Sequence, residues 1–252
     1  PSNISIDKYN EILERKNRGN YIETDWCRGF SVVLKRDVIK KIGKVDEIYG
    51  LAYFDDVDYS VTAIEAGFLC IKALDTYIYH HRNVTSLELF KGEKWNELHE
   101  KNKLIYYKKW GKPLKISVIL DLEASENDAY RKQISDMIYS LARKQHRLYI
   151  WCSDKRITNR LVHTNIVIRN YPISALKLMA GLDLYLNARK RTAKRYDAVF
   201  VHNARLGDVF HRRFSKSIDV ITNNNNENFQ DFVISTVNKL KEKTKENIHV
   251  PV

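Results

Sequence analysis

The sequence predicts an α/β protein with two domains, residues 1–112 and 113–252. Two observations lead to this prediction. After Pro113, apolar runs of strand length alternate with longer runs of helical period, the order typical of a parallel sheet covered on both faces. Before Pro113 the pattern is less regular, and three aspartates crowd at the start of one expected helix. With 252 residues, 44% of them hydrophobic, the chain can build two cores.

The first half opens with a polar run over residues 7–20 that has only a weak apolar pattern. We expect a strand over residues 30–34 and then a short helix ended by Gly43, because glycine readily adopts the left-handed conformation found after helix ends. A helix over residues 61–66 follows the aspartates, and a second strand is expected over residues 70–73.

The three aspartates are Asp55, Asp56 and Asp58. Carboxylates at a helix start are favoured by the unpaired backbone N–H groups and by the positive end of the helix dipole. However, Asp55 and Asp56 are adjacent, and like charges this close raise the pKa of at least one of them. An acid/base group or a metal ligand requires such an environment. From these residues alone, both the structural and the functional interpretation stay open.

Several motifs follow one another in a defined order over residues 22–112. They are Trp26-Cys27-Arg28-Gly29, Gly43, Asp46-Glu47, Tyr53-Phe54-Asp55-Asp56-Val57-Asp58, Ala66-Gly67-Phe68, His80 and Lys109-Trp110-Gly111. In this order they resemble the C-terminal half of the catalytic domain of family-2 inverting glycosyltransferases, which have the GT-A fold. The sequence departs from that family at Asp55, where glutamate is usual.

The resemblance implies roles for the aspartates. Asp56 would be the general base that takes the proton from an acceptor hydroxyl as it attacks the anomeric carbon, and Asp55 would be the other member of the acidic pair. Because the reaction is a single displacement with inversion, one base suffices. Asp58 is expected to cap the following helix.

The resemblance also implies binding residues. Trp26, Arg28 and Gly29 would line the acceptor side of the cleft. His80 would be a ligand of a divalent cation (Mn²⁺ or Mg²⁺) that neutralises the diphosphate of a nucleotide-sugar donor. His81 is the alternative ligand. A histidine pair is more often structural than metal-binding, so this alternative stays open too.

The N-terminal half of such a domain, which would hold the nucleotide and the metal-binding Asp-x-Asp, has no counterpart before residue 22. We therefore expect the chain to be a piece of a larger protein and to bind a nucleotide sugar poorly when alone.

The second half reads as a Rossmann-like parallel-sheet domain. Strands are expected over residues 114–122, 148–152, 165–169, 198–202 and 219–222, and helices over 130–144, 174–195, 206–214 and 229–243. This order resembles the N-terminal lobe of GT-B glycosyltransferases, most clearly in residues 196–203 and 218–223. The glycine-rich turn expected after the first strand is missing, which argues against a phosphate cradle there. A ligand would meet the residues after the strands, namely Ser125, Asn127, Ser153, His202 and Asn203.

The net charge is +12, and most of the basic excess lies after Pro113, in residues 189–195 and 205–216. A solvated helix face is the commoner explanation of such runs. The alternative is an anionic partner, such as a nucleotide diphosphate, an anionic membrane surface or a phosphorylated polymer. No nucleic acid is expected as a partner, because no known binding motif accompanies the charge.

Three cysteines, Cys27, Cys70 and Cys152, lie far apart in the sequence and are odd in number. This pattern argues for a reducing compartment and against a disulfide scaffold or a zinc site. No apolar run has membrane-spanning length. We therefore expect a cytoplasmic protein, free or attached peripherally to the inner face of the membrane.

Three functions follow from these patterns. The first is a fragment of a multidomain glycosyltransferase that moves a sugar from a nucleotide-sugar donor to a glycan, glycoprotein or lipid-linked acceptor with inversion. The second is a non-catalytic binding or scaffolding module that recruits an anionic partner through its basic second domain. The third is an unrelated α/β enzyme whose aspartates bind a metal for hydrolysis. The ordered motifs favour the first.

Overall fold

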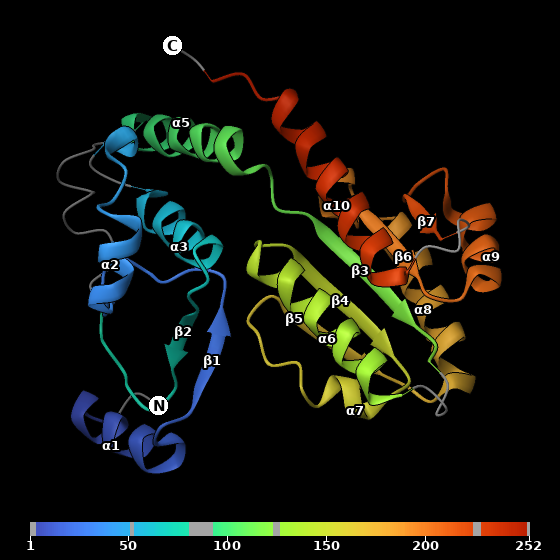
Figure 1. Cartoon of the computed structure of the whole chain (residues 1–252), viewed down its shortest axis with the longest axis horizontal. Coiled ribbons are helices and arrows are strands. Elements are labelled where there is room, and N and C mark those ends of the chain that lie inside the picture. Colours follow the sequence, from blue (N-terminus) through green and yellow to red (C-terminus); the bar gives the residue numbers. More distant parts are fainter. Residues whose placement is uncertain (1–3, 51–52, 81–92, 123–126, 224–227, 251–252) are drawn as a thin grey trace. The chain divides into compact units, whose positions relative to one another are not determined.

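The computed structural model describes residues 4–50, 53–80, 93–122, 127–223 and 228–250. The chain divides into two compact units (Figure 1). Unit 1 consists of residues 1–111 together with 244–252, and unit 2 of residues 112–243. None of the described helices combines the length and the apolar character needed to cross a membrane.

Unit 1 contains a two-stranded antiparallel sheet, in which β1 (Tyr21–Thr24) pairs with β2 (Cys70–Ala73). The polar run at its start forms a helix that is capped by Ser5, whose hydroxyl accepts a hydrogen bond from Lys8 N (3.3 Å). The helical elements of this unit are α1 (Ile6–Asn17), α2 (Arg36–Ile42), η1 (Glu47–Tyr49), α3 (Asp55–Glu65) and α5 (Glu93–Trp110).

The strand expected over residues 30–34 is absent, and this prediction was wrong. Residues 31–35 have no regular secondary structure, and Val33 is 97% exposed. The described partner of β2 is β1, so the apolar residues 30–34 do not enter the sheet. The strand over residues 70–73 and the helix that ends at Gly43 are confirmed, and Gly43 has the left-handed φ of 80°.

Asp58 does not cap α3, so the capping role expected from the sequence was wrong. Its buried carboxylate instead binds side chains from two other helical elements. Because α3 begins at Asp55, Asp58 lies inside the first turn, where it is 3% exposed. Its Oδ1 accepts hydrogen bonds from Tyr49 Oη (3.1 Å) and Trp110 Nε1 (2.5 Å), and its Oδ2 accepts one from Lys109 Nζ (2.9 Å). Burial and the charge of Asp58 raise the pKa of Tyr49, so this donor stays protonated. The carboxylate thereby joins η1, α3 and α5.

Unit 2 is built on a five-stranded parallel sheet of order β5-β4-β3-β6-β7, which confirms the predicted α/β class. Counted from β3, this is the 3-2-1-4-5 order of doubly wound sheets. Its strands are β3 (Lys115–Leu120), β4 (Arg147–Cys152), β5 (Ile166–Asn170), β6 (Ala198–Val201) and β7 (Val220–Thr222). Its helical elements are α6 (Asp128–Arg143), α7 (Lys155–Thr158), α8 (Ile173–Ala188), η2 (Thr192–Lys194), α9 (Ala204–Phe214) and α10 (Phe229–Glu246).

The helix predicted up to residue 195 ends earlier, at Ala188. The side chain of Asn187 accepts a hydrogen bond from Tyr196 N (2.9 Å), and Arg195 Nε donates to Lys190 O (2.8 Å). These bonds fold residues 189–195 into a turn that returns the chain to β6.

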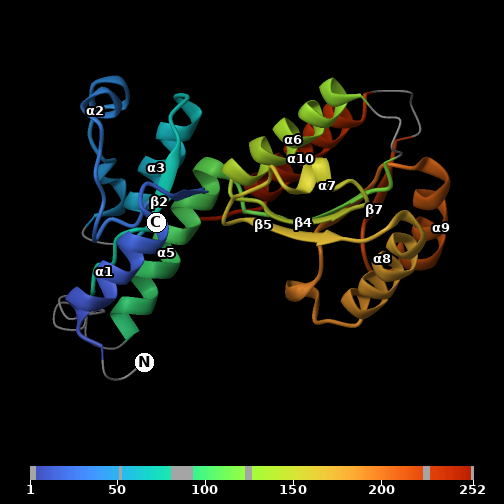
Figure 2. The same ribbon diagram turned by 90° about the horizontal axis from the view of Figure 1, so that it is seen from below.

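Alternate residues of the central strands supply two cores. Ile116, Val118 and Leu120 of β3 pack under α6 and α10, whereas Ile119 belongs to the core under α8 and α9. This alternation follows from the period of two in a β-strand. Figure 2 shows α6 and α10 on one face of the sheet and α8 and α9 on the other.

Gly207 allows α9 to lie close to the sheet. A Cβ atom at this position would lie 2.3 Å from Cγ2 of Thr222 and 3.5 Å from Cβ of Val201. We therefore expect Gly207→Ala to destabilise unit 2 by about 1–3 kcal/mol, as overpacking usually does, in urea unfolding. Thr222→Ser removes the clashing methyl group and should restore most of the loss in the double variant. If Gly207→Ala lowered the free energy of unfolding equally in the wild type and in the Thr222→Ser variant, this packing would be contradicted.

Candidate functional site

The backbone just before the acidic pair is strained. Tyr53 and Phe54 have left-handed φ angles of 68° and 71°, which non-glycine residues rarely adopt. Asn102 Nδ2 donates to Tyr53 O (3.2 Å), and Asp58 N donates to Phe54 O (2.8 Å). Such conformations cost about 1–3 kcal/mol each and persist where the surroundings hold them. Here they turn the chain so that Asp55 starts α3.

Asp56 is half-buried and held by backbone N–H groups. Its Oδ2 accepts a hydrogen bond from Gly29 N (2.9 Å), and its Oδ1 accepts one from Val57 N (2.9 Å). Burial raises the pKa of Asp56, and the charge of Asp55 acts in the same direction, against the two N–H groups. A carboxylate whose pKa is raised toward the working pH is a better proton acceptor.

The loop of residues 26–30 lies against Asp56. Gly29 leaves little room, since a Cβ atom there would be 3.3 Å from Cβ of Asp56. In the same loop, the Arg28 guanidinium lies 5.2 Å from the centre of the Trp26 ring. The structure therefore places all three residues expected on the acceptor side in the loop that contacts the expected base.

His80 reaches the same loop from beyond β2. Its ring lies 4.3 Å from that of Phe30, centre to centre, and its side chain is exposed. His81 lies outside the described residues. Within the part of the chain that the structure describes, no three His, Cys, Asp or Glu side chains are grouped so that they could hold a metal ion. The described residues thus do not fit the expected cation site, and no step below runs through a cation.

Cys27 of this loop meets Cys70 of β2, which comes 43 positions later in the sequence. Cys27 N donates to Ser60 Oγ (3.0 Å), and Cys70 Sγ donates to Ser60 O (3.9 Å). The side-chain contact with Cys70 lowers the pKa of Cys27 to about 7. All three cysteines are free thiols. Sequence separation alone gave no sign of this contact, which depends on the β1–β2 pairing.

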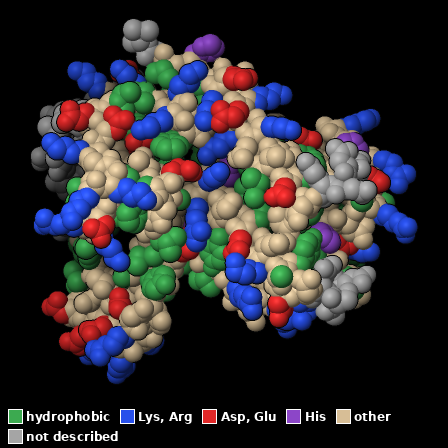
Figure 3. All heavy atoms as spheres, viewed as in Figure 1, with side chains coloured by type: hydrophobic (Ala, Val, Ile, Leu, Met, Phe, Trp, Pro, Cys, Tyr) green, Lys and Arg blue, Asp and Glu red, His purple; other side chains and the backbone are tan. Residues whose placement is uncertain are grey.

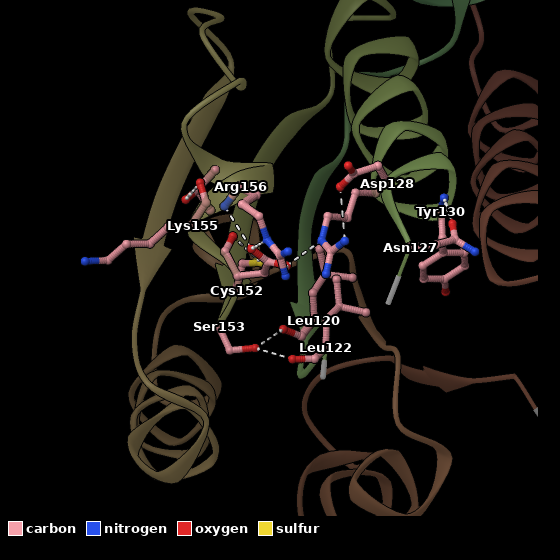
Figure 4. Close-up of polar contacts among 12 residues, drawn as sticks. Leu120, Leu122, Asn127, Asp128, Tyr130, Cys152, Ser153, Lys155 and Arg156 are labelled. Carbon is pink, nitrogen blue, oxygen red and sulfur yellow. Dashed lines mark hydrogen bonds and ion pairs between the residues drawn. The ribbon is translucent and has the colours of Figure 1, made fainter. Parts of the chain in front are cut away.

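At the carboxyl edge of the large sheet, most of the residues expected to meet a ligand support the fold instead (Figure 4). Ser153 Oγ donates to Leu122 O (3.0 Å). Asn127 caps α6, where its side chain accepts from Tyr130 N (2.8 Å), and Asn203 caps α9 in the same way. Ser125 lies outside the described residues.

The polar residue at this edge that the sequence analysis missed is Asp121, directly after β3. Its side chain is 2% exposed, and among the described residues its Oδ1 has no hydrogen-bond partner. His202 Nδ1 lies 3.9 Å from this oxygen, and Tyr130 Oη lies 2.8 Å from His202 Nε2. The three residues meet where β3 and β6 are neighbours, the switch point of a doubly wound sheet. The sequence sign of this polar group was an aspartate at the end of an apolar strand.

Gly29→Ala tests the contact in unit 1. The added methyl group pushes the loop from Asp56 and lengthens the hydrogen bond that stabilises the carboxylate. We expect the pKa of Asp56 to rise above its wild-type value in a pH titration of carboxyl ¹³C chemical shifts. Gly181→Ala in unit 2 is the control for a glycine substitution, since Gly181 has no left-handed φ and a Cβ atom there would make an ordinary contact of 3.4 Å with Phe210 Cε1. An unchanged pKa of Asp56 in Gly29→Ala would show that the contact does not hold the carboxylate.

Comparisons with known proteins found no match to this chain among protein-family models, curated proteins or solved structures. What the chain does is therefore argued from its own residues. In unit 1 these are the loop of residues 26–30, the strained turn before α3 and the half-buried Asp56 between them.

Proposed function

We propose that unit 1 belongs to an inverting glycosyltransferase in which Asp56 is the general base. The observation that carries this proposal is the loop of residues 26–30. Gly29 of this loop contacts Asp56, and Phe30 contacts His80. Candidate residues from three separate parts of the sequence therefore lie around one segment. The GT-A relationship stays a proposal that rests on the order of the motifs.

In the proposed reaction, an acceptor hydroxyl donates a hydrogen bond to a free lone pair of Asp56. Its oxygen attacks the anomeric carbon while the bond from that carbon to the diphosphate oxygen breaks. The proton passes to Asp56, and the diphosphate leaves with the electron pair of the broken bond. Gly29 N and Val57 N each occupy one lone pair, one on either carboxylate oxygen, and so fix the direction in which the base points.

The neighbouring residues suit a sugar substrate. Trp26 offers an aromatic surface on which a sugar ring of the acceptor can stack, and the Arg28 guanidinium close to its ring can donate hydrogen bonds to acceptor hydroxyls. The donor would be a nucleotide sugar, and the acceptor a glycan, a glycoprotein or a lipid-linked saccharide. A divalent cation that neutralises the diphosphate remains part of the proposal. The free cysteines support a cytoplasmic site of action.

Asp56→Asn tests the proposal in the full-length protein. Removing a general base should lower kcat/KM for sugar transfer by about 10²- to 10⁴-fold, measured with a nucleotide-sugar donor. The activity of the wild type should rise with pH through the raised pKa of Asp56, because the base must be deprotonated.

Asp37→Asn is the matched control, since Asp37 lies in the first turn of α2 with a side chain that is 81% exposed. If Asp56→Asn transferred sugar as fast as the wild type, unit 1 would be a binding module and not a catalytic one.

A further inference from the structure

The outer face of α8 is apolar. Leu178, Leu182 and Leu186 are 74%, 49% and 52% exposed, and Tyr185 beside them is 38% exposed. Positions four residues apart lie on one side of a helix, so these side chains form a continuous stripe, here called the α8 face. The opposite side of the helix is also apolar, with Leu176, Ala180 and Leu184 buried in the core of unit 2.

A helix on the surface of a globular protein usually turns polar residues outward. Single exposed apolar residues need no explanation, but four large ones aligned on one helix form a patch that marks a contact surface. The α8 face is such a patch, since it includes the most exposed leucine among the described residues, Leu178.

Exposed cations accompany the α8 face. Lys177 of the same helix is exposed, and the Arg189 guanidinium lies 4.0 Å from the centre of the Tyr185 ring. Lys190, Arg191 and Lys194 follow in the exposed turn after the helix. Between described residues, no ion pair neutralises any of these five cations.

The acidic residue of α8, Asp183, is half-buried and binds a residue of the core. The carboxylate of Asp183 accepts a hydrogen bond from Tyr196 Oη (2.7 Å), a residue of the core.

The neighbouring helix extends the basic border. Gly181 of α8 packs against Phe210 of α9, and both helices cover the same face of the sheet (Figure 2). On its outer side α9 exposes Arg205, Arg212 and Arg213. The other face of the unit 2 sheet differs. In the view of Figure 3, which has α6 and α10 in front, Lys and Arg side chains are spread among Asp and Glu side chains.

We propose that the α8 face docks unit 2 onto an anionic lipid bilayer. Leucine and tyrosine side chains on one helix face, bordered by lysine and arginine, are the chemistry of helices that lie in the headgroup region of a membrane. The apolar stripe enters the boundary of the acyl chains, while the cations meet lipid phosphates and carboxylates. The charge complementarity selects lipid over an apolar protein groove. This inference does not depend on the proposed sugar transfer.

The test is co-sedimentation of the protein with vesicles of phosphatidylcholine, with and without phosphatidylserine. The wild type should bind the anionic vesicles, bind neutral ones less, and release as the salt concentration rises. In the variant Leu178→Gln/Leu182→Gln/Leu186→Gln, the affinity for the anionic vesicles should fall by a factor of about ten or more. Lys190→Gln/Arg191→Gln/Lys194→Gln should lose the preference for phosphatidylserine.

The matched control is Val162→Gln, which changes an apolar side chain of unit 2 that is 53% exposed outside the α8 face and should leave binding unchanged. Circular dichroism checks that the leucine variant stays folded, as expected for exposed positions. Absence of wild-type binding, or equal binding by the leucine variant, would overturn the proposal. So would a wild-type dimer, found by sedimentation velocity, that the leucine changes dissociate, because a second copy would then cover the α8 face.

Discussion

Unit 1 depends on how its acidic helix start is held in place. The hydrogen bond from Gly29 N to Asp56 Oδ2 ties the loop of residues 26–30 to α3, and the buried Asp58 carboxylate holds the same helical turn from below. Leaving a buried carboxylate such as that of Asp58 without one of its hydrogen-bond donors typically costs about 1–3 kcal/mol for each donor lost. That stabilisation can offset the strain of about 1–3 kcal/mol at each left-handed residue before the helix. The position of Asp56 therefore follows from one structural aspartate two residues later, Asp58.

The two units are stabilised in different ways. Unit 2 has a five-stranded sheet with an extensive apolar core on each face, and its loops are fixed by asparagine caps and by the Ser153 hydroxyl. Unit 1 has a small described core of Tyr49, Val61 and Tyr106, and a polar network supplies much of its order. In unit 1, the polar network holds the Asp56 carboxylate at a half-buried position where burial raises its pKa. In unit 2, the large core keeps the fold stable although the outer face of α8 exposes apolar side chains.

Local patterns predicted the features that depend on local physics. The strands of unit 2 and the helix end at Gly43 follow from periodicity and backbone preference, and the sequence pattern located them correctly. Features that depend on a distant partner were missed. Residues 30–34 have the composition of a strand, but β2 pairs with β1 instead. The anchoring role of Asp58 requires Trp110, 52 residues later, and the Cys27–Cys70 contact requires the register of the small sheet. The residues of unit 1 selected from the sequence lie around the loop of residues 26–30, and their assignment to a site and their roles stay proposals.

The central claim is that the loop of residues 26–30 and Asp56 together receive the substrate. The most direct measurement is a titration of the ¹⁵N-labelled full-length protein with UDP- and GDP-sugars, followed by two-dimensional NMR. The account predicts that the largest chemical-shift changes occur at the Trp26 indole N–H and at the amides of Gly29 and Val57, which adjoin the base. Shift changes confined to the carboxyl edge of the large sheet, near His202 and Asn203, would contradict it and would place the ligand in unit 2.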